Sequence, residues 1–145
     1  NENMPSHVIK LLINAFEEQN KSLNDSTILL LGVSYKPDVK DIQISPAENI
    51  IEKLKQLNVN IKIYDPYFKS ENIFEIDTES NLIDALSNCD GIILVTSHKE
   101  FHNIDPKFLK SKLKSPIFID SKCVLDQDES IKAGLIYRGL GRGKL

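Results

Sequence analysis

Residues 26–57 limit the possible fold more strongly than any other stretch of this chain. The segment Thr27–Gly32 is a short apolar run that ends in glycine, which is typical of a strand buried on both faces of a parallel sheet. Residues 46–57 are predicted to form a helix, because their apolar side chains recur at helical spacing and would form one packing face. These side chains are Ile50, Ile51, Leu54 and Leu57. The stretch therefore predicts a buried strand followed by a helix that packs against the sheet.

The connection between this strand and helix is long and ends at a well-marked helix start. Ser45 can act as N-cap, and Pro46 suits the first helical position because it has no N–H to leave unpaired. Glu48 completes the S-x-x-E pattern of a capping box. Residues 33–44 form a connection of about a dozen residues, whereas such connections usually have about two to six. A longer ordered connection is usually functional, so this loop is the first candidate for ligand contact.

Strands and helices alternate along the rest of the chain. Further strands are predicted at about residues 59–65, 90–96, 116–119 and 135–137, with a short one around 73–76. Helices are predicted at about 81–88, capped by Ser80 with Leu82, Ile83 and Leu86 facing inward, at 106–113, and as a turn near 128–133. This alternation predicts an α/β fold with a doubly wound, Rossmann-like parallel sheet of five or six strands flanked by helices. The preferred strand order is 3-2-1-4-5-6.

A helix is also predicted before the first strand. Pro5 suits its first position, and Val8–Phe16 is apolar around much of the helix circumference. Such a helix needs partners on more than one side. We therefore expect a subunit interface here, or the end of a longer helix.

Composition and charge exclude several classes of function. A net charge of −3 and a pI near 5.6 give no electrostatic footprint for nucleic acid. The apolar runs are too short to span a membrane, and residues 1–10 lack the pattern of a signal peptide. Cys89 and Cys123 lack a C-x-x-C spacing, which indicates free thiols rather than a disulfide or zinc site. We expect a cytoplasmic protein with no nucleic-acid or membrane partner.

Ligands of doubly wound sheets bind beyond the carboxyl ends of the strands, where the strand order reverses. A reversal between the first strand and strand 92–96 would bring three loops together. These loops are residues 33–44, 97–102 and 121–125. The side chains that would surround the resulting crevice are Tyr35, Lys36, His98 and Lys122. Two ammonium groups in one crevice suit an anionic ligand such as a diphosphate, although both lysines could equally be ordinary surface residues.

Several familiar motifs are missing or incomplete. Gly32 is followed by Val33 and Ser34, so the first strand leads into neither G-x-G-x-x-G nor a P-loop, and a complete dinucleotide site of the usual kind is not expected. The glycines at 139, 141 and 143 have no helix behind them, which predicts a flexible basic end more than a phosphate cradle.

Two further groups of reactive side chains are not predicted to form a metal site or a catalytic site. His98, Glu100 and His102 form H-x-E-x-H, but zinc proteases need H-E-x-x-H on a helix, so no metal site is predicted. Cys89 is expected in the core. Cys123 lies beside Lys122, but no His or Asp at suitable spacing supports nucleophilic catalysis there.

Residues 31–47, L-G-V-S-Y-K-P-D-V-K-D-I-Q-I-S-P-A, closely resemble the signature that opens the C-terminal domain of the UDP-glucose/GDP-mannose dehydrogenase family. These enzymes are NAD-dependent nucleotide-sugar 6-dehydrogenases. Other matches follow in the same order, namely Asn3-Met4-Pro5, Tyr64-Asp65-Pro66, Thr96-Ser97-His98 with Phe101, Asp120-Ser121-Lys122 and residues 137–143. The chain looks most like the bacterial branch that acts on UDP-N-acetylmannosamine or UDP-N-acetylglucosamine.

The resemblance implies a three-part enzyme. Residues 1–25 would be the end of the central dimerisation helix and its linker, and residues 26–145 the C-terminal UDP-sugar-binding domain of a homodimer. NAD would be bound mainly by an N-terminal domain. The enzyme would oxidise the C6 hydroxyl of a UDP-sugar to a uronic acid, a polysaccharide precursor, with two NAD reduced. The family's catalytic Cys and Lys lie in the earlier domains, and neither Cys89 nor Cys123 matches that Cys, so this part alone is expected to be inactive.

The resemblance also implies roles for individual residues. Positions matching Tyr35 and Lys36 contact the nucleotide sugar, as does the position of Lys122, which is usually Arg. Gln43 stands where the family usually has an Arg that approaches the cofactor phosphates. Gln keeps hydrogen-bonding capacity but loses the charge and the bidentate fork, which weakens the expectation of cofactor contact at Gln43.

Two other functions remain open from the sequence. One is a stand-alone nucleotide-binding module without catalysis, against which the apolar helix Val8–Phe16 argues, because a self-sufficient domain should not begin with an unpartnered helix. The other is a flavodoxin-like receiver or small-molecule enzyme of similar topology. The first strand is not followed by an acidic pair, which argues against a receiver.

Overall fold

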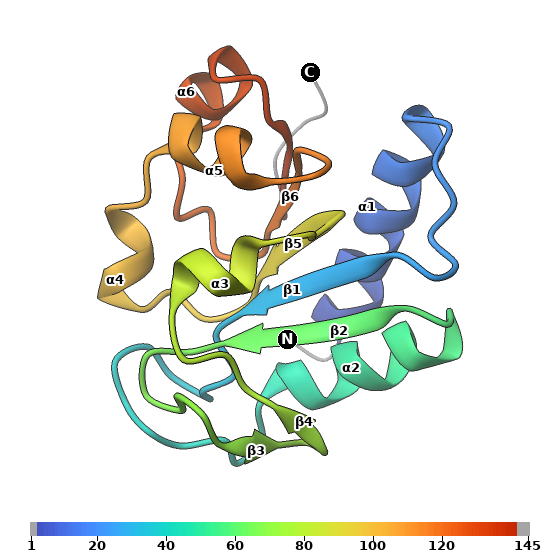
Figure 1. Ribbon diagram of the computed structural model, residues 1–145. Coiled ribbons are helices and arrows are strands. Elements are labelled where there is room, and N and C mark those ends of the chain that lie inside the picture. Colours follow the sequence, from blue (N-terminus) through green and yellow to red (C-terminus); the bar gives the residue numbers. More distant parts are fainter. Residues whose placement is uncertain (1–2, 142–145) are drawn as a thin grey trace.

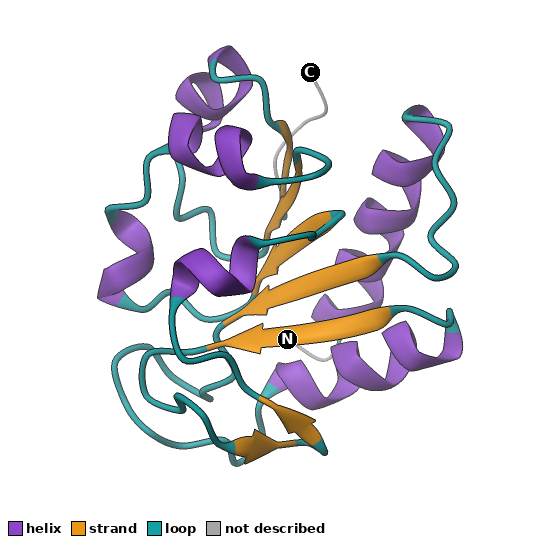
Figure 2. Cartoon of the chain, viewed as in Figure 1, coloured by secondary structure: helices purple, strands orange, loops and turns teal. Residues whose placement is uncertain are grey.

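Five parallel strands form the central sheet of the computed structural model, which describes residues 3–141 (Figures 1 and 2). Their order is β2-β1-β5-β6-β7, and every pairing is parallel. The strands are β1 (Thr27–Leu31), β2 (Asn60–Tyr64), β5 (Gly91–Leu94), β6 (Ile117–Asp120) and β7 (Ile136–Gly139). The doubly wound parallel fold is confirmed, and the strand order reverses between β1 and β5 as expected.

The preferred order with a sixth strand is wrong, because the segment near residues 73–76 does not join the sheet. It forms a separate antiparallel hairpin of β3 (Asn72–Ile73) and β4 (Ile76–Asp77). Phe74 and Glu75 between them have φ of 52° and 67°, so the chain reverses within two residues. The sequence lacks the Asn-Gly or Gly pair that usually marks such a turn, which is why one strand was expected.

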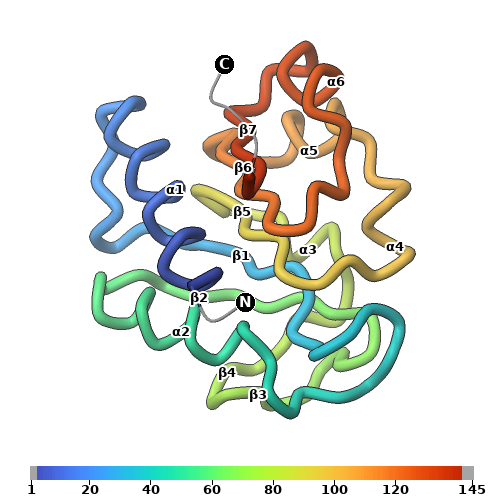
Figure 3. The backbone as a smooth tube through the Cα atoms, turned by 180° about the vertical axis from the view of Figure 1, so that it is seen from behind, coloured from blue at the N-terminus to red at the C-terminus, as the bar shows by residue number. Residues whose placement is uncertain are grey.

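Helices cover both faces of the sheet. One face carries α1 (Met4–Glu18) and α2 (Pro46–Gln56), which lie in front of the strands in Figure 3. The other face carries α3 (Leu82–Leu86), α4 (Lys99–His102), α5 (Pro106–Lys112) and α6 (Gln127–Lys132). Alternate residues of β1 serve the two layers, with Ile28 in the first core and Leu29 in the second. Within residues 3–141, no helix has the length and apolar character needed to cross a membrane.

The N-terminal helix finds its partners inside this domain. α1 packs against α2, β6 and β7, and its side chains Val8, Leu12, Ala15 and Phe16 are buried there. At its end, Glu18 forms an ion pair with Arg138 of β7. The expectation that this helix has no partner within the domain is therefore wrong, because α2, β6 and β7 cover the face that carries its apolar side chains. Its apolar character no longer argues against a self-sufficient domain.

Two predicted helix starts are corrected in detail. The Ser45 hydroxyl accepts the Ala47 N–H at 3.1 Å, while its own N–H bonds the Ile42 carbonyl at 3.3 Å, so the Ser45 cap forms without the reciprocal Glu48 half of a capping box. In α3 the cap is Asn81 rather than Ser80, with its side chain accepting from the Asp84 N–H at 2.8 Å. With the helix beginning one residue later than expected, Ala85 and Leu86 face the core, and Ile83 is 60% exposed.

The exits of β1 and β5 approach each other closely at Gly32. This residue has φ +91°, and its N–H bonds the Tyr64 carbonyl at 2.9 Å. A Cβ added there would lie 2.5 Å from the Thr96 Cβ and 2.9 Å from the Thr96 nitrogen. Only glycine fits both the backbone angle and the space, so this contact fixes where the loop after β1 leaves the sheet.

A buried carboxylate at the end of β2 holds the start of that loop. One oxygen of Asp65, Oδ2, accepts the N–H of Val33 at 2.8 Å and that of Ser34 at 3.3 Å. The same oxygen is 2.9 Å from His98 Nε2, and Oδ1 accepts the Tyr67 N–H at 2.8 Å. Asp65 has no exposed surface. Burial favours a raised pKa, but the hydrogen bonds from His98, Val33 and Tyr67 outweigh it and hold the pKa of Asp65 below its usual value of 3.8.

We predict that Gly32→Ala lowers the free energy of unfolding by about 2–5 kcal/mol, because it combines a strained φ with a clash. The control is Gly141→Ala, at φ +80°, where among the described residues no atom beyond the chain neighbours lies within 4 Å of the added Cβ. It should cost only the backbone strain, about 1–2 kcal/mol. Urea denaturation measures both. Equal losses in the two variants would contradict the close approach of Gly32 to Thr96.

We predict that Asp65→Asn destabilises the protein by about 2–4 kcal/mol at pH 7, since hydrogen bonds to a buried charge are lost or weakened. Because the folded pKa lies below the unfolded value of 3.8, the stabilisation by the wild-type carboxylate is complete above that value and shrinks as the pH falls below it. Urea unfolding between pH 7 and 3 should show the difference from wild type narrowing at the acid end.

The matched control is Asp41→Asn. Asp41 is exposed in the loop after β1, and among the described residues its carboxylate accepts only the Gln43 N–H. Its effect should stay within about 0.5 kcal/mol. A gap between wild type and Asp65→Asn that stayed constant down to pH 3 would contradict the lowered pKa.

Candidate functional site

A cavity of about 640 Å³ lies at the carboxyl edge of the sheet, where the loops after β1, β5 and β6 meet. Its walls come from six parts of the chain. The lining residues are Met4 and Pro5 of α1, Ser34, Tyr35, Pro37, Ile44 and Ser45 of the loop after β1, Pro46, Glu48 and Asn49 of α2, Val95, Thr96 and Ser97 after β5, and Ser121, Lys122 and Leu140. This is the switch point at which doubly wound sheets bind ligands.

The loops converge as expected, but not all four expected side chains reach the cavity. Tyr35 and Lys122 line it, and Tyr35 is 46% exposed. Lys36 is exposed and is not part of the lining. Its Nζ lies 5.6 Å from the centre of the Tyr35 ring, so the ammonium group is close to the cavity without facing it. Of the described residues in the lining, Lys122 alone is cationic and Glu48 alone anionic.

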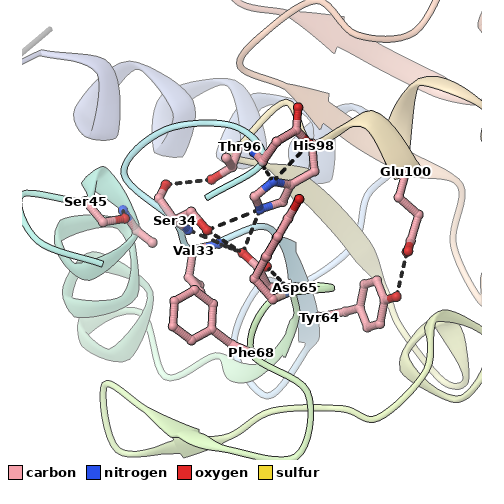
Figure 4. Close-up of polar contacts among 12 residues, drawn as sticks. Val33, Ser34, Ser45, Tyr64, Asp65, Phe68, Thr96, His98 and Glu100 are labelled. Atoms are coloured by element: carbon pink, nitrogen blue, oxygen red, sulfur yellow. Dashed lines mark hydrogen bonds and ion pairs between the residues drawn. The ribbon is translucent and has the colours of Figure 1, made fainter. Parts of the chain in front are cut away.

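His98 does not line the crevice, so this expectation is wrong. Its side chain is fully buried beneath the loop after β1, as Figure 4 shows for its contacts with Ser34 and Asp65. Nε2 lies 2.9 Å from Asp65 Oδ2 and 3.3 Å from the Ser34 hydroxyl, and Nδ1 accepts the Asp38 N–H at 2.9 Å. Since Nδ1 accepts, the proton lies on Nε2 and is donated to Asp65. The imidazole is a structural link and presents no free nitrogen to a ligand.

The other side chains of the H-x-E-x-H pattern have separate partners. Glu100 accepts the Tyr64 hydroxyl at 2.5 Å, and burial together with this carboxylate raises the pKa of Tyr64 (Figure 4). His102 Nε2 is 3.3 Å from the Ser97 carbonyl. In the part of the chain that the structure describes, no three His, Cys, Asp or Glu side chains are grouped to hold a metal ion.

A second buried aspartate fixes the loop that carries Lys122. Asp120 Oδ1 accepts the Lys122 N–H at 3.2 Å, and Oδ2 accepts the Leu125 N–H at 2.9 Å and the Tyr137 hydroxyl at 2.8 Å. The Lys122 backbone is thus held while its side chain stays exposed at the cavity. Ser121 donates its hydroxyl to the Leu94 carbonyl at 2.6 Å, which joins this loop to the end of β5.

The remaining candidates lie outside the cavity lining. Gln43 is exposed on the loop after β1, where its N–H bonds Asp41 at 2.9 Å. Cys89 is in the core as expected, 3.0 Å from the Ala85 carbonyl, and burial raises the pKa of its thiol to about 11. Cys123 is half-buried. Gly143, with the basic residues around it, lies outside the described residues.

Sequence reasoning missed the two residues that organise the site, Asp65 and Asp120. Each follows or ends an apolar strand, which was a usable signal, because a carboxylate at the end of a central parallel strand can bond the N–H groups of the adjoining loop. Ile44 was also missed. It lines the cavity with φ +57°, and the residue is 87% exposed, an unusual combination for a β-branched residue.

Comparison with known proteins gives a consistent result. The family model "UDP-glucose/GDP-mannose dehydrogenase family, UDP binding domain" matches residues 29–127. UDP-N-acetyl-D-mannosamine dehydrogenase of Methanococcus vannielii is 32% identical over 99% of this chain, and UDP-glucose 6-dehydrogenase of Bacillus subtilis is 28% identical over 98%. The chain spans about a third of the length of these relatives, 33% and 31% respectively.

The fold agrees with these relatives. The crystal structure of an NDP-N-acetyl-D-galactosaminuronic acid dehydrogenase from Methanosarcina mazei superposes with a TM-score of 0.91 at 26% identity. It covers 98% of this chain, which in turn covers 30% of that protein. The family match includes both Tyr35 and Lys122, so the matched domain forms most of the cavity walls, and the other lining residues are Met4, Pro5 and Leu140. The chain therefore belongs to the UDP-glucose/GDP-mannose dehydrogenase family and corresponds to the UDP-binding domain at the C-terminal end of its members.

Proposed function

We propose that this domain binds the UDP portion of a nucleotide sugar in the cavity at the switch point, as part of an NAD-dependent nucleotide-sugar 6-dehydrogenase. The observation that carries the proposal is the position of the cavity, because residues of the matched UDP-binding domain form most of its walls. Its volume of about 640 Å³ is within the usual range for small-molecule sites, about 300–1,000 Å³.

The lining chemistry suits a nucleoside diphosphate. Lys122 offers an ammonium group on a backbone fixed by Asp120, and Ser97 adds a hydroxyl. Tyr35 presents a half-exposed ring that can contact a base or sugar. Lys36 lies beside that ring, and rotation of its flexible side chain would bring a second cation to the diphosphate.

In this proposal the domain supplies binding energy and no reacting group. Contacts to the nucleotide, remote from the sugar C6, hold the substrate in position for oxidation elsewhere in the enzyme. NAD would accept the hydride in each of the two oxidation steps that convert the C6 hydroxyl to a carboxylate. Gln43 is proposed as a contact to that cofactor, since it is exposed on the same loop. The complete enzyme is proposed to be a cytoplasmic homodimer that makes a polysaccharide precursor.

A second candidate is a nucleotide-binding module that does not take part in oxidation. The observation in its favour is the burial of α1, which gives the domain a core of its own. Mixing the 145-residue chain with UDP-sugar and NAD should give no NADH under either proposal. The two proposals differ in what happens when the UDP contacts of this domain are removed within a longer protein. If the domain belongs to a dehydrogenase, the turnover of the catalytic domains changes, whereas a separate binding module has no effect on their turnover.

We predict that Lys122→Ala weakens UDP binding about 10- to 100-fold, because a charge-assisted contact to phosphate is lost. Isothermal titration calorimetry on the 145-residue chain measures the dissociation constant. The control Lys107→Ala removes a positive charge that is also exposed, on α5 outside the cavity lining, and should leave the affinity within about twofold. Uridine without phosphates should bind wild type and Lys122→Ala equally. Equal weakening by both variants would point to net charge alone and contradict a contact at Lys122.

We predict that Lys36→Ala in the complete dehydrogenase raises KM for the UDP-sugar about tenfold or more, with KM for NAD nearly unchanged. The reason is that Lys36 acts on the substrate diphosphate and not on the cofactor. Steady-state kinetics with each substrate varied in turn provides the measurement, with Lys69→Ala, an exposed lysine outside the loop and the cavity lining, as control. An unchanged KM for the UDP-sugar would exclude the role of Lys36.

A further inference from the structure

One imidazole joins the base of the loop after β1 to its tip. On the base side, His98 Nε2 and the N–H groups of Val33 and Ser34 share the Asp65 carboxylate (Figure 4). On the tip side, His98 Nδ1 accepts the Asp38 N–H at 2.9 Å. The two ring nitrogens thus serve different parts of the structure, and only Nδ1 contacts the part of the loop that follows Lys36.

The tip is a closed segment with Asp38 at its centre. The Tyr35 N–H bonds the Asp41 carbonyl at 2.6 Å, which closes residues 35–41 into a ring. Asp38, three residues from either end, has φ +62°, a conformation that needs support from its surroundings. That support comes from two directions, since its N–H bonds His98 Nδ1 and its carboxylate accepts the Lys99 N–H at 2.9 Å.

The surroundings leave the imidazole little freedom. The Tyr67 ring centre is 5.0 Å from that of His98 and the Phe101 ring centre is 5.6 Å away. The charged groups that face it are the Asp65 carboxylate and, at 3.9 Å from Nδ1, that of Asp38. Neither His98 nor Asp38 lines the cavity, so neither is placed to contact a ligand there.

We propose that His98 is a positioning residue for the nucleotide, acting through Nδ1 on Asp38 to hold the Tyr35–Asp41 segment in the geometry that binds UDP. The inference rests on the proposed function of the cavity. Without the Nδ1 contact, Asp38 at the centre of the closed segment is held only by its carboxylate, through the Lys99 N–H. The ion pair between Lys40 of the segment and Glu71 is exposed, so the segment is held less firmly and moves more about its Tyr35–Asp41 end. Tyr35 and Lys36 then sample many positions. UDP binding must order them, and this loss of conformational entropy weakens the affinity.

Two substitutions of His98 separate its two nitrogens. In His98→Asn the amide oxygen can take the place of Nδ1 as acceptor for Asp38, while the contact to Asp65 is lost. In His98→Gln the longer amide can donate to Asp65 as Nε2 does, while the acceptor for Asp38 is lost. Urea unfolding gives the stability of each variant, calorimetry its affinity for UDP, and NMR hydrogen exchange the protection of the Asp38 amide.

We expect His98→Gln to bind UDP about tenfold more weakly than wild type and to lose protection of the Asp38 amide. His98→Asn should keep that protection and bind within about threefold of wild type, although it is the less stable of the two. The positioning role would be overturned if the less stable of the two variants were also the weaker UDP binder. It would also be overturned if His98→Gln bound UDP as tightly as wild type. No UDP binding by wild type would instead contradict the proposed function itself.

A second pair of variants at a half-exposed position covers the case in which the His98 variants do not fold. Asp38→Gly removes the acceptor for the Lys99 N–H and the conformational restriction at φ +62°, whereas Asp38→Asn keeps an oxygen acceptor and tolerates that φ. Asp38→Gly should weaken UDP binding about fivefold or more, and Asp38→Asn should restore most of the affinity. Equal wild-type affinity in both would overturn the inference.

Discussion

The hydrogen bonds of the buried Asp65 carboxylate determine how the site is built. This side chain, at the end of β2, binds the first two residues of the loop after β1 and the imidazole that follows β5. Three neighbouring strands are thereby tied together at the point where the strand order reverses. An uncharged side chain could not satisfy so many donors at once, and a charge without them would be too costly to bury. The carboxylate is stable there because the loop binds it, and the loop is ordered because the carboxylate is there.

The structure divides its polar residues into those that fix the backbone and those that remain free for a ligand. Asp65 and Asp120 are buried, and each is bonded to the loop of a candidate ligand-contact residue. Tyr35 and Lys122, in those same loops, keep their side chains exposed at the cavity. A rigid backbone that carries free side chains lowers the entropic cost of binding without filling the site in advance. This arrangement explains how a sheet without a glycine-rich phosphate loop can still offer a nucleotide site.

The fold followed from the sequence wherever the signals were local. The apolar run of β1, the Ser45 cap and the unusually long loop all lie within one stretch, and each had its own signal. The misses depended on distant contacts. The burial of His98 follows from Asp65 and Asp38, 33 and 60 residues away, and the packing of α1 depends on β6 and β7 at the other end of the chain. The β3–β4 turn at Phe74 and Glu75 contains no glycine or asparagine from which a turn could be predicted. These features depend on tertiary contacts, which cannot be predicted from a local sequence pattern.

A crystal structure of the 145-residue chain with bound UDP would show whether the cavity holds the nucleotide. We expect the diphosphate within hydrogen-bonding distance of Lys122 Nζ, in the cavity between the loops after β1, β5 and β6. We also expect an ordered Tyr35–Asp41 segment, with the Asp38 N–H still bonded to His98 Nδ1. UDP bound elsewhere on the domain, or bound in the cavity while the His98–Asp38 contact is broken, would contradict these expectations.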